Sequence, residues 1–368
     1  MSTNLQIGIV GLPNVGKSTL FNAITKAGAE AANFPFCTIE PNVGIVEVPD
    51  SRLYTLADMF KPKKTTPAFT RFVDIAGLVA GASRGEGLGN KFLSHIRETD
   101  AIAHVVRCFE DGNITHVAGS IDPVRDMDII NTELCLADLE TIEKKLQKTG
   151  KLAQAGIKEA KAQMPTLEKI DAALGEGTPA RALGLSEDDL EIVRELNLIT
   201  LKPVLYVLNT AEDDIADPMA NPYVQKAAAQ AEAEGAKWVP ISAEIEQEVS
   251  ELDAEEAKAF LADLGEEEPG LHRLIKSAYS LLGLINFFTV GPDECRSWTV
   301  RENTKAPQAA GKIHSDIERG FIRAEIVSYD DLVSCGGYNG VREKGLLRIE
   351  GKDYEIQDGD VAYFRFNV

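Results

Sequence analysis

The sequence predicts an α/β protein that combines a mostly parallel sheet, an inserted helical hairpin and a small β-rich C-terminal domain. Short apolar runs alternate with helical patterns early in the chain and again after residue 198. A segment with only helical periodicity interrupts them at residues 128–197, and β-branched and aromatic stretches dominate from residue 282 onward. Strands that alternate with helices form right-handed parallel units with helices on both faces.

The parallel sheet is predicted from uninterrupted apolar runs, which are typical of strands buried on both faces. Such runs occupy residues 5–10, 69–75, 101–108 and 203–208. Helical patterns lie between them at residues 18–26, 91–97 and 222–234. These segments assign residues 1–127 and 198–281 to one domain.

The interrupting segment has apolar residues at helical spacing. Leucine and isoleucine recur between Ile129 and Leu146 and again between Leu167 and Leu196, with possible turns at Gly156 and at residues 175–179. We therefore predict an antiparallel, coiled-coil-like hairpin at residues 128–197, although no unbroken heptad register is present.

The last part of the chain predicts a separate α+β domain at residues 282–368. Strand patterns surround a short helical pattern at residues 308–319, and this arrangement is typical of a β-grasp fold. The strand patterns are at residues 287–290, 297–300, 320–327, 346–349 and 361–366.

Composition limits the environment and the partners. The five cysteines are scattered without a Cys-x-x-Cys pair, which argues against disulfides and zinc and for a reducing compartment. No apolar run approaches the roughly 18 residues of a membrane helix, and there is no signal peptide pattern. We expect a cytoplasmic protein without a membrane partner, and a monomer.

The net charge of −20 argues against broad affinity for nucleic acid, but the charge is unevenly distributed. Residues 244–268 hold eleven acidic residues and one lysine, whereas residues 140–163 hold six lysines and three glutamates. The basic segment could contact phosphate locally, or it could be an ordinary solvated helix face.

A phosphate-binding motif follows the first apolar run. Residues 11–18, GLPNVGKS, match GxxxxGK[ST] between a predicted strand and a predicted helix. The glycines let backbone N–H groups face the phosphates of a nucleotide, Lys17 neutralises the β- and γ-phosphates, and the Ser18 hydroxyl can ligate Mg²⁺. The predicted contacts of this loop are Asn14, Val15, Gly16, Lys17, Ser18 and Thr19.

Two further segments are predicted to complete the phosphate end of the site. Asp74-Ile75-Ala76-Gly77 has the form DxxG at the end of a strand, so Asp74 would hold Mg²⁺ and the Gly77 N–H would contact the γ-phosphate. Thr38 is a natural second hydroxyl ligand for Mg²⁺, although a single threonine is weak support. The predicted metal ligands are Ser18, Thr38 and Asp74.

The base-reading motif departs from the guanine-specific pattern. Asn209-Thr210-Ala211-Glu212 stands where Asn-Lys-x-Asp is expected, and Ser242-Ala243 begins the second element. Glu212 is one methylene too long for the bidentate contact that an aspartate makes with guanine, and Thr210 cannot cover the base as a lysine stem does. We predict that ATP binds and GTP binds more weakly. The alternative is a GTPase that tolerates the variant motif.

The group that positions the attacking water is not evident. Leu78 follows the DxxG element where many relatives of this class have a glutamine. His116 is a candidate catalytic residue beside Lys17, because it follows a strand whose carboxyl end should lie near the nucleotide, but it could equally be a surface histidine. Asn14 could help to seat K⁺ as a monovalent activator.

Taken together, these motifs resemble the YchF family of Obg-related P-loop proteins along essentially the whole chain. The resemblance rests on GLPNVGKST, NFPFCTIEPN, DIAGLVAGASRGEGLGNKFL, NTAE and the C-terminal GKDYEIQDGDVAYFRFNV, which is similar to a TGS domain. It implies an ATPase in a GTPase fold that associates with the ribosome, through the large subunit or the whole particle, and is stimulated by it. RNA contact would occur only through the ribosome. The resemblance also implies that Thr38 is a Mg²⁺ ligand and supports His116 as catalytic.

Two functions of different classes therefore remain. The chain could be an enzyme whose ATP cycle switches its affinity for the ribosome, as Lys17, Ser18 and Asp74 favour. It could instead be a ribosome-binding module that nucleotide stabilises, with incidental turnover, as Leu78 slightly favours.

Overall fold

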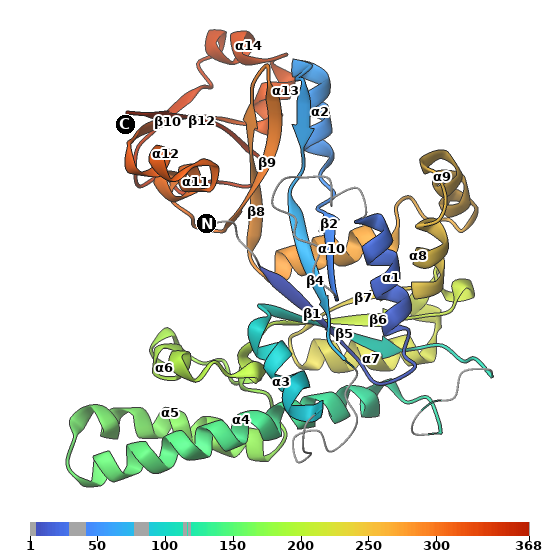
Figure 1. The fold of residues 1–368 in the computed structure, drawn as a ribbon, viewed down its shortest axis with the longest axis vertical. Helices are drawn as coiled ribbons and strands as arrows, with labels where there is room; N and C mark the ends of the chain where they lie inside the picture. The colour runs from blue at the N-terminus through green and yellow to red at the C-terminus, as the bar shows by residue number, and fades with distance from the viewer. Residues whose placement is uncertain (1–4, 29–41, 77–87, 113–115, 117–118, 368) are drawn as a thin grey trace. The chain divides into compact units, whose positions relative to one another are not determined.

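The computed structural model describes residues 5–28, 42–76, 88–112, 116 and 119–367. The chain forms two compact units, drawn as a ribbon in Figure 1. Of the described residues, the N-terminal unit comprises Gln6–Gly44 with Arg71–Ala278, and the C-terminal unit comprises residues 5, 45–70 and 279–367. Within the described residues, no helix has the length and apolar character needed to cross a membrane.

The core of the N-terminal unit is a six-stranded, mostly parallel sheet in the order β2-β4-β1-β5-β6-β7. Its strands are β1 (Gln6–Val10), β2 (Val43–Glu47), β4 (Phe69–Asp74), β5 (Ala101–Arg107), β6 (Val204–Asn209) and β7 (Lys237–Ile241). The pairings of β1 with β4 and β5, and of β6 with β5 and β7, are all parallel. Every residue of β5 and β6 is buried, as expected for central strands.

Helices connect these strands, and α7, α8 and α9 each begin after a residue whose side chain caps the helix. They are α1 (Lys17–Ala27), α3 (Leu88–Glu98), α7 (Pro222–Ala233), α8 (Ala243–Val249), α9 (Ala254–Asp263) and α10 (Gly270–Leu281). Asp253 and Glu256 form a capping box at the start of α9. The buried Glu246 carboxylate accepts hydrogen bonds from the first two N–H groups of α10, at 2.8 and 3.0 Å. Burial raises the pKa of Glu246.

The segment between β5 and β6 forms a long helical hairpin, as the apolar spacing predicts (Figure 1). It consists of α4 (Pro123–Gln154) and α5 (Lys158–Gly175), joined by a short turn in which Gly156 has a φ of +93°. Helix α4 begins five residues earlier than predicted because Asp122 caps it by accepting a hydrogen bond from the Arg125 N–H. Short helices follow at η2 (Ala180–Leu183), α6 (Glu187–Val193), η3 (Arg194–Leu196) and η4 (Ile199–Leu201).

The C-terminal unit contains a second six-stranded sheet in the order β11-β10-β12-β8-β9-β3. Its strands are β3 (Lys64–Thr66), β8 (Leu284–Val290), β9 (Glu294–Arg301), β10 (Phe321–Ser328), β11 (Arg348–Glu350) and β12 (Asp360–Phe366). The helices of this part are α11 (Ala306–Ile313), α12 (Ser315–Arg319), α13 (Tyr329–Ser334) and α14 (Tyr338–Glu343). Phe287, Ile326 and Phe364 lie in its core. The predicted fold class is confirmed.

One segment packs differently from the sequence-based assignment, which placed all of residues 1–127 in the nucleotide-binding domain. Residues 45–70 contain α2 (Ser51–Phe60) and β3, and they belong to the C-terminal unit. Strand β3 pairs with β9, and Leu53 and Leu56 of α2 are buried in the core of that unit.

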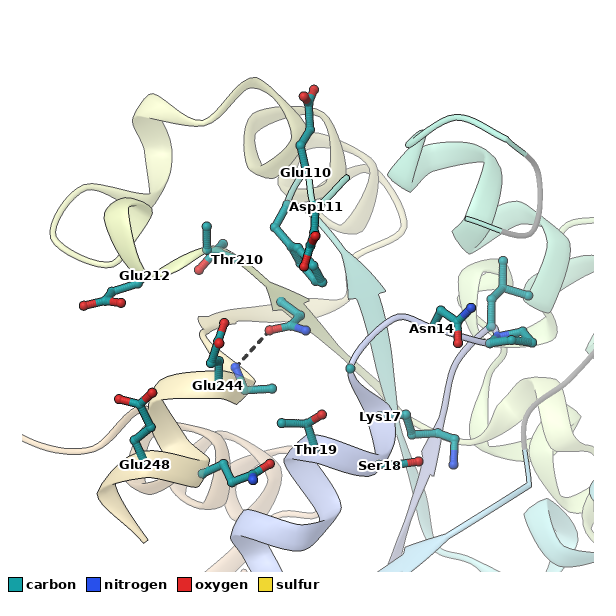
Figure 2. Close-up of a pocket in the computed structure, with 18 of the residues that line it drawn as sticks. Asn14, Lys17, Ser18, Thr19, Glu110, Asp111, Thr210, Glu212, Glu244 and Glu248 are labelled. Carbon is teal, nitrogen blue, oxygen red and sulfur yellow. Dashed lines mark hydrogen bonds between the residues drawn. The ribbon is translucent and has the colours of Figure 1, made fainter. Parts of the chain in front are cut away.

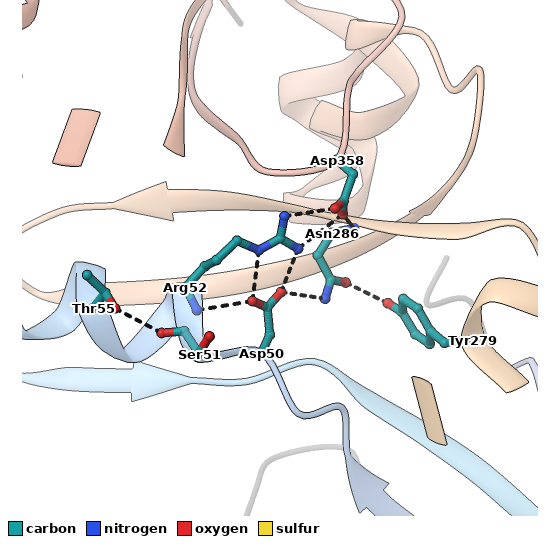
Figure 3. Close-up of polar contacts among 7 residues, drawn as sticks. All are labelled: Asp50, Ser51, Arg52, Thr55, Tyr279, Asn286 and Asp358. Atoms are coloured by element: carbon teal, nitrogen blue, oxygen red, sulfur yellow. Dashed lines mark hydrogen bonds and ion pairs between the residues drawn. The ribbon is translucent and has the colours of Figure 1, made fainter. Parts of the chain in front are cut away.

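A polar network also holds this segment in the C-terminal unit (Figure 3). Arg52 donates to Asp50 at 2.9 Å and to Asp358 at 2.7 Å, and the Asn286 side chain donates to Asp50 at 3.2 Å. Hydrogen bonds from Arg52 to Asp50 are the main cause that raises its pKa above the ordinary value. The contacts of Arg52 with Asp358 and of Asn286 with Asp50 join positions more than 200 residues apart in sequence, so local sequence patterns do not reveal them.

Candidate nucleotide-binding site

The phosphate-binding loop lies between β1 and α1, where the sequence places it. Gly16 has a φ of +92°, and a Cβ atom there would lie 2.1 Å from the Asn209 side-chain nitrogen. A Cβ atom at Gly11 would lie 2.9 Å from the Val105 carbonyl oxygen. Both positions therefore require glycine. Helix α1 has no side-chain cap, so its first N–H groups can bind the oxygens of a phosphate.

Lys17 and Asp74 meet at this end of the site, and Ser18 follows Lys17 in the first turn of α1. Strand β1 lies beside β4, which ends at Asp74, and the Lys17 ammonium forms an ion pair with the Asp74 carboxylate. The Ser18 hydroxyl and the Asp74 carboxylate are hard oxygen ligands of the kind that Mg²⁺ prefers, so this donor set fits the ion. Thr38, Gly77 and Leu78 lie outside the described residues.

Asn209 connects the phosphate-binding loop to the base-reading segments. It ends β6, and its side-chain nitrogen donates to the Val15 carbonyl at 2.8 Å. Its side-chain oxygen accepts from the Ala243 N–H at 2.9 Å, the contact drawn as a dashed line in Figure 2. Ser242 caps α8 by accepting from the Ile245 N–H. One side chain thus fixes both ends of the site relative to each other.

Thr210 and Glu212 have different environments. Thr210 is only 3% exposed, and its hydroxyl lies 3.4 Å from the Ile241 carbonyl oxygen. Glu212 begins the short helix η5 (Glu212–Asp214) and is exposed at the cavity wall. The Thr210 side chain is therefore held away from the cavity interior, whereas the Glu212 side chain is exposed to it.

These elements enclose a cavity of about 1200 Å³. Figure 2 shows Lys17 and Ser18 at one end, with Glu212 and Thr210 at the other. Asn14 and Thr19 also line it, whereas Val15 is buried behind the loop. Lys17 is the only basic side chain among the described lining residues. Six acidic residues line the remainder: Glu110, Asp111, Glu212, Glu244, Glu248 and Glu251.

Residues 109–112 form a wall of the cavity that sequence reasoning missed. They follow β5, and the position of a loop after the carboxyl end of a central strand was the available signal. Cys108 precedes this wall and is fully buried, which raises the pKa of its thiol above the ordinary range. It therefore remains a neutral thiol.

His116 lies apart from the described lining residues. Its side chain is 4% exposed and forms a 2.7 Å hydrogen bond with Asp126 in the first turn of α4. Arg125 contacts the other Asp126 carboxylate oxygen at 3.0 Å. The surface alternative is therefore wrong for this histidine, because its ring is buried and paired.

Known proteins match this chain along nearly its full length. A Bacillus subtilis (strain 168) protein named ribosome-binding ATPase YchF is 56% identical over 364 residues, which cover 99% of this chain and 100% of the relative. An Escherichia coli O157:H7 protein of the same name is 54% identical over 361 residues, covering 98% and 99%. The chain belongs to the YchF family. The resemblance that the motifs indicate is confirmed.

A solved structure of the YchF family has the same fold. The Schizosaccharomyces pombe YchF GTPase is 42% identical, with a TM-score of 0.89 over 99% of this chain and 98% of that chain. Residues 6–138 match a family described as 50S ribosome-binding GTPase, and residues 284–367 match the YchF-GTPase C-terminal family, described as a protein of unknown function. A Pyrococcus horikoshii GTP binding protein, 21% identical with a TM-score of 0.62, shares the fold.

The names of these YchF relatives include both "ATPase" and "GTPase". The names therefore do not decide the base preference of this chain, and the side chains at the base end of its cavity bear on it directly.

Proposed function

We propose that this chain is a ribosome-associated ATPase that hydrolyses ATP to ADP and phosphate with Mg²⁺, and that its nucleotide state switches its affinity for the ribosome. The observation that supports this most directly is the cavity, which combines a complete phosphate-binding loop with an altered base end. The relatives named ribosome-binding ATPase YchF support the partner and the reaction.

At the phosphate end, charge and positioning supply the catalysis. The Lys17 ammonium is held beside Asp74, close to the N-terminus of α1, where a triphosphate would offer a stronger partner. Ser18 and Asp74 would hold Mg²⁺, with Thr38 as a third ligand. The ion would neutralise charge that develops on the phosphate oxygens.

At the base end, the side chains support a preference for adenine. A guanine-specific site needs a carboxylate that accepts from two guanine N–H groups and a donor for the guanine O6 atom. The Ala243 N–H already donates to Asn209, and the longer Glu212 changes the carboxylate geometry. The exocyclic amine of adenine can donate to an acidic side chain, as the guanine N–H groups can, so the preference rests on the engaged Ala243 N–H and on the changed Glu212 geometry. A lost contact of this kind is worth about 1.5–3 kcal/mol, which is at least about tenfold in affinity.

The alternatives are a GTPase of the Obg type and a nucleotide-stabilised ribosome-binding module with incidental turnover. The decisive experiment measures steady-state ATP and GTP hydrolysis with and without ribosomes, in K⁺ and in Na⁺. We expect slow basal ATP hydrolysis that ribosomes stimulate, with K⁺ as a monovalent activator seated near Asn14, which lines the cavity. Equal rates with both nucleotides favour the GTPase alternative. Ribosome binding without stimulation favours the binding module.

We further propose that the helical hairpin supplies the salt-dependent part of ribosome binding. Lys148, Lys151, Lys158 and Lys161 are exposed around the turn between α4 and α5, whereas Lys144 is paired with Glu140 at 2.5 Å. The acidic segment at residues 244–268 should be repelled by RNA. Each phosphate that a lysine neutralises should steepen the slope of the logarithm of the binding constant against the logarithm of the salt concentration by roughly 0.7–0.9.

Co-sedimentation with ribosomes over a salt series tests this surface. The variant changes Lys148, Lys151, Lys158 and Lys161 to Gln, and the control makes the same charge change at the exposed Lys61, Lys63, Lys226 and Lys258. We expect a shallower slope only for the hairpin variant. An unchanged slope means that the hairpin lysines form a solvated face.

A further inference from the structure

Two walls enclose the base end of the cavity. Residues 109–112 follow β5 and form one wall, and residues 209–212, which begin at the last residue of β6, form the other. Figure 2 shows Glu110 and Asp111 on the first wall, with Thr210 and Glu212 on the second. Two polar side chains that do not line the cavity, Asn221 and Arg107, contact these walls from behind.

The Asn221 side chain joins both walls through a single amide group. Its nitrogen donates to the Cys108 carbonyl at 2.8 Å and to the Asp214 carboxylate at 2.8 Å. Cys108 precedes the first wall, and Asp214 ends the short helix that Glu212 begins. The Asn221 oxygen accepts from the Tyr223 N–H at 2.7 Å and so caps α7. Both N–H bonds of the amide are therefore used to hold the walls, and its oxygen holds the helix.

Arg107 fixes the shape of the first wall. It is 1% exposed, its Nε donates to the Phe109 carbonyl at 3.1 Å, and its guanidinium carbon lies 4.5 Å from the centre of the Phe109 ring. A second nitrogen approaches the Asp111 carbonyl at 3.5 Å. The Tyr223 hydroxyl donates to Glu110 at 2.6 Å and adds a tether from α7. A buried guanidinium that lacks hydrogen bonds costs free energy, so these contacts hold the wall in one conformation.

We propose that Asn221 and Arg107 are positioning residues for nucleotide recognition, which set the separation of the two walls and present Phe109 and Glu212 to the base. This inference rests on the proposed ATP binding. Because the two side chains act only on the base end, their loss should weaken binding of the base and ribose. Contacts of the phosphate-binding loop should remain. ATP affinity and the preference for ATP over GTP should therefore fall, while kcat at saturating ATP should stay near that of the parent.

The test compares ATP with tripolyphosphate, a ligand that has the phosphates without the base and ribose. Asn221→Asp keeps an oxygen to cap α7 but removes both donated hydrogen bonds and places a carboxylate beside Asp214. We expect its Kd for ATP to rise by at least about tenfold, since two hydrogen bonds and a new repulsion act on the walls. Its Kd for tripolyphosphate should change by less than about twofold, because that ligand meets only the phosphate end.

Matched variants separate this role from general damage. Gln225→Glu makes the same amide-to-acid change on the exposed side of α7 and should leave both constants unchanged. Arg107→Met should weaken ATP binding when it is introduced into the parent. In a Phe109→Ala background it should cause little further loss of ATP affinity. Arg107→Lys keeps the charge and loses the planar donor geometry. Its dissociation constants for ATP and tripolyphosphate provide a second test if Asn221→Asp folds poorly.

Three results would overturn the proposal: unchanged ATP affinity in Asn221→Asp, equal loss of ATP and tripolyphosphate affinity, or additive effects of Arg107→Met and Phe109→Ala. The failure of the proposed function would look different. In that case the parent protein itself would bind GTP as well as ATP or would show no turnover, before any variant is compared.

Discussion

The two ends of the cavity are built in opposite ways. Apart from Asp74, the phosphate end comes from one continuous segment, residues 11–19, with backbone N–H groups, two glycines without room for a Cβ atom, and Lys17. The base end comes from segments around residues 110, 210 and 245, and it is made of side chains, six of which are acidic.

This difference indicates where each property of the protein resides. Backbone contacts to phosphate do not depend on the base, so the phosphate end should determine whether a triphosphate is bound and hydrolysed. Side-chain contacts differ between bases, so the base end should determine which nucleotide is used. Substitutions at one end should therefore change one property and spare the other.

The largest effect is expected for Lys17→Ala. Removal of the only basic side chain among the described lining residues should reduce ATP hydrolysis by at least about a hundredfold and weaken triphosphate binding for ATP and GTP alike. Lys226→Ala, an exposed lysine on α7, is the control. Turnover and binding assays with both nucleotides measure the effect. Undiminished turnover in Lys17→Ala would be incompatible with an enzymatic role.

A smaller and more selective effect is expected at the base end. The parent should bind ATP at least about tenfold more tightly than GTP, and Thr210→Lys with Glu212→Asp should recover part of the GTP affinity. The recovery should be partial, because Thr210 is buried against the Ile241 carbonyl and a lysine there must leave that site. Calorimetric titration of the parent, both single variants and the double variant gives the comparison. Equal dissociation constants in the parent contradict the prediction.

The smallest effect is expected for His116, which belongs to neither end of the described cavity. His116→Ala should lower ribosome-stimulated ATP turnover several-fold while ATP affinity stays nearly unchanged. Without the His116 side chain, Asp126 still has Arg125 as a partner, so the variant should fold. His95→Ala, on the exposed side of α3, is the control. Stimulated rates equal to the parent would leave His116 with a structural role in holding Asp126.

The features that the sequence predicts correctly are those that depend on neighbours in the chain. Residues 5–26 predict a strand, a phosphate loop and a helix because all three depend on neighbours in the chain, and the structure has them in that order. The hairpin and the C-terminal strands were predictable from local periodicity in the same way. The burial of Thr210, the pairing of His116 with Asp126 and the packing of residues 45–70 were not, since each depends on a partner from another element.

The sequence by itself therefore determined the family, the fold class and the chemistry of the phosphate end, because short-range patterns of glycine, charge and hydrophobic spacing carry that information. Tertiary structure decided the base end. Asn209 meets Val15 and Ala243 there, and Asn221 meets Cys108 and Asp214, across separations of up to 194 residues. Hydrogen bonds of this kind depend on the position of each atom within a few tenths of an ångström, and only the packing of the strands and helices places both partners within that range.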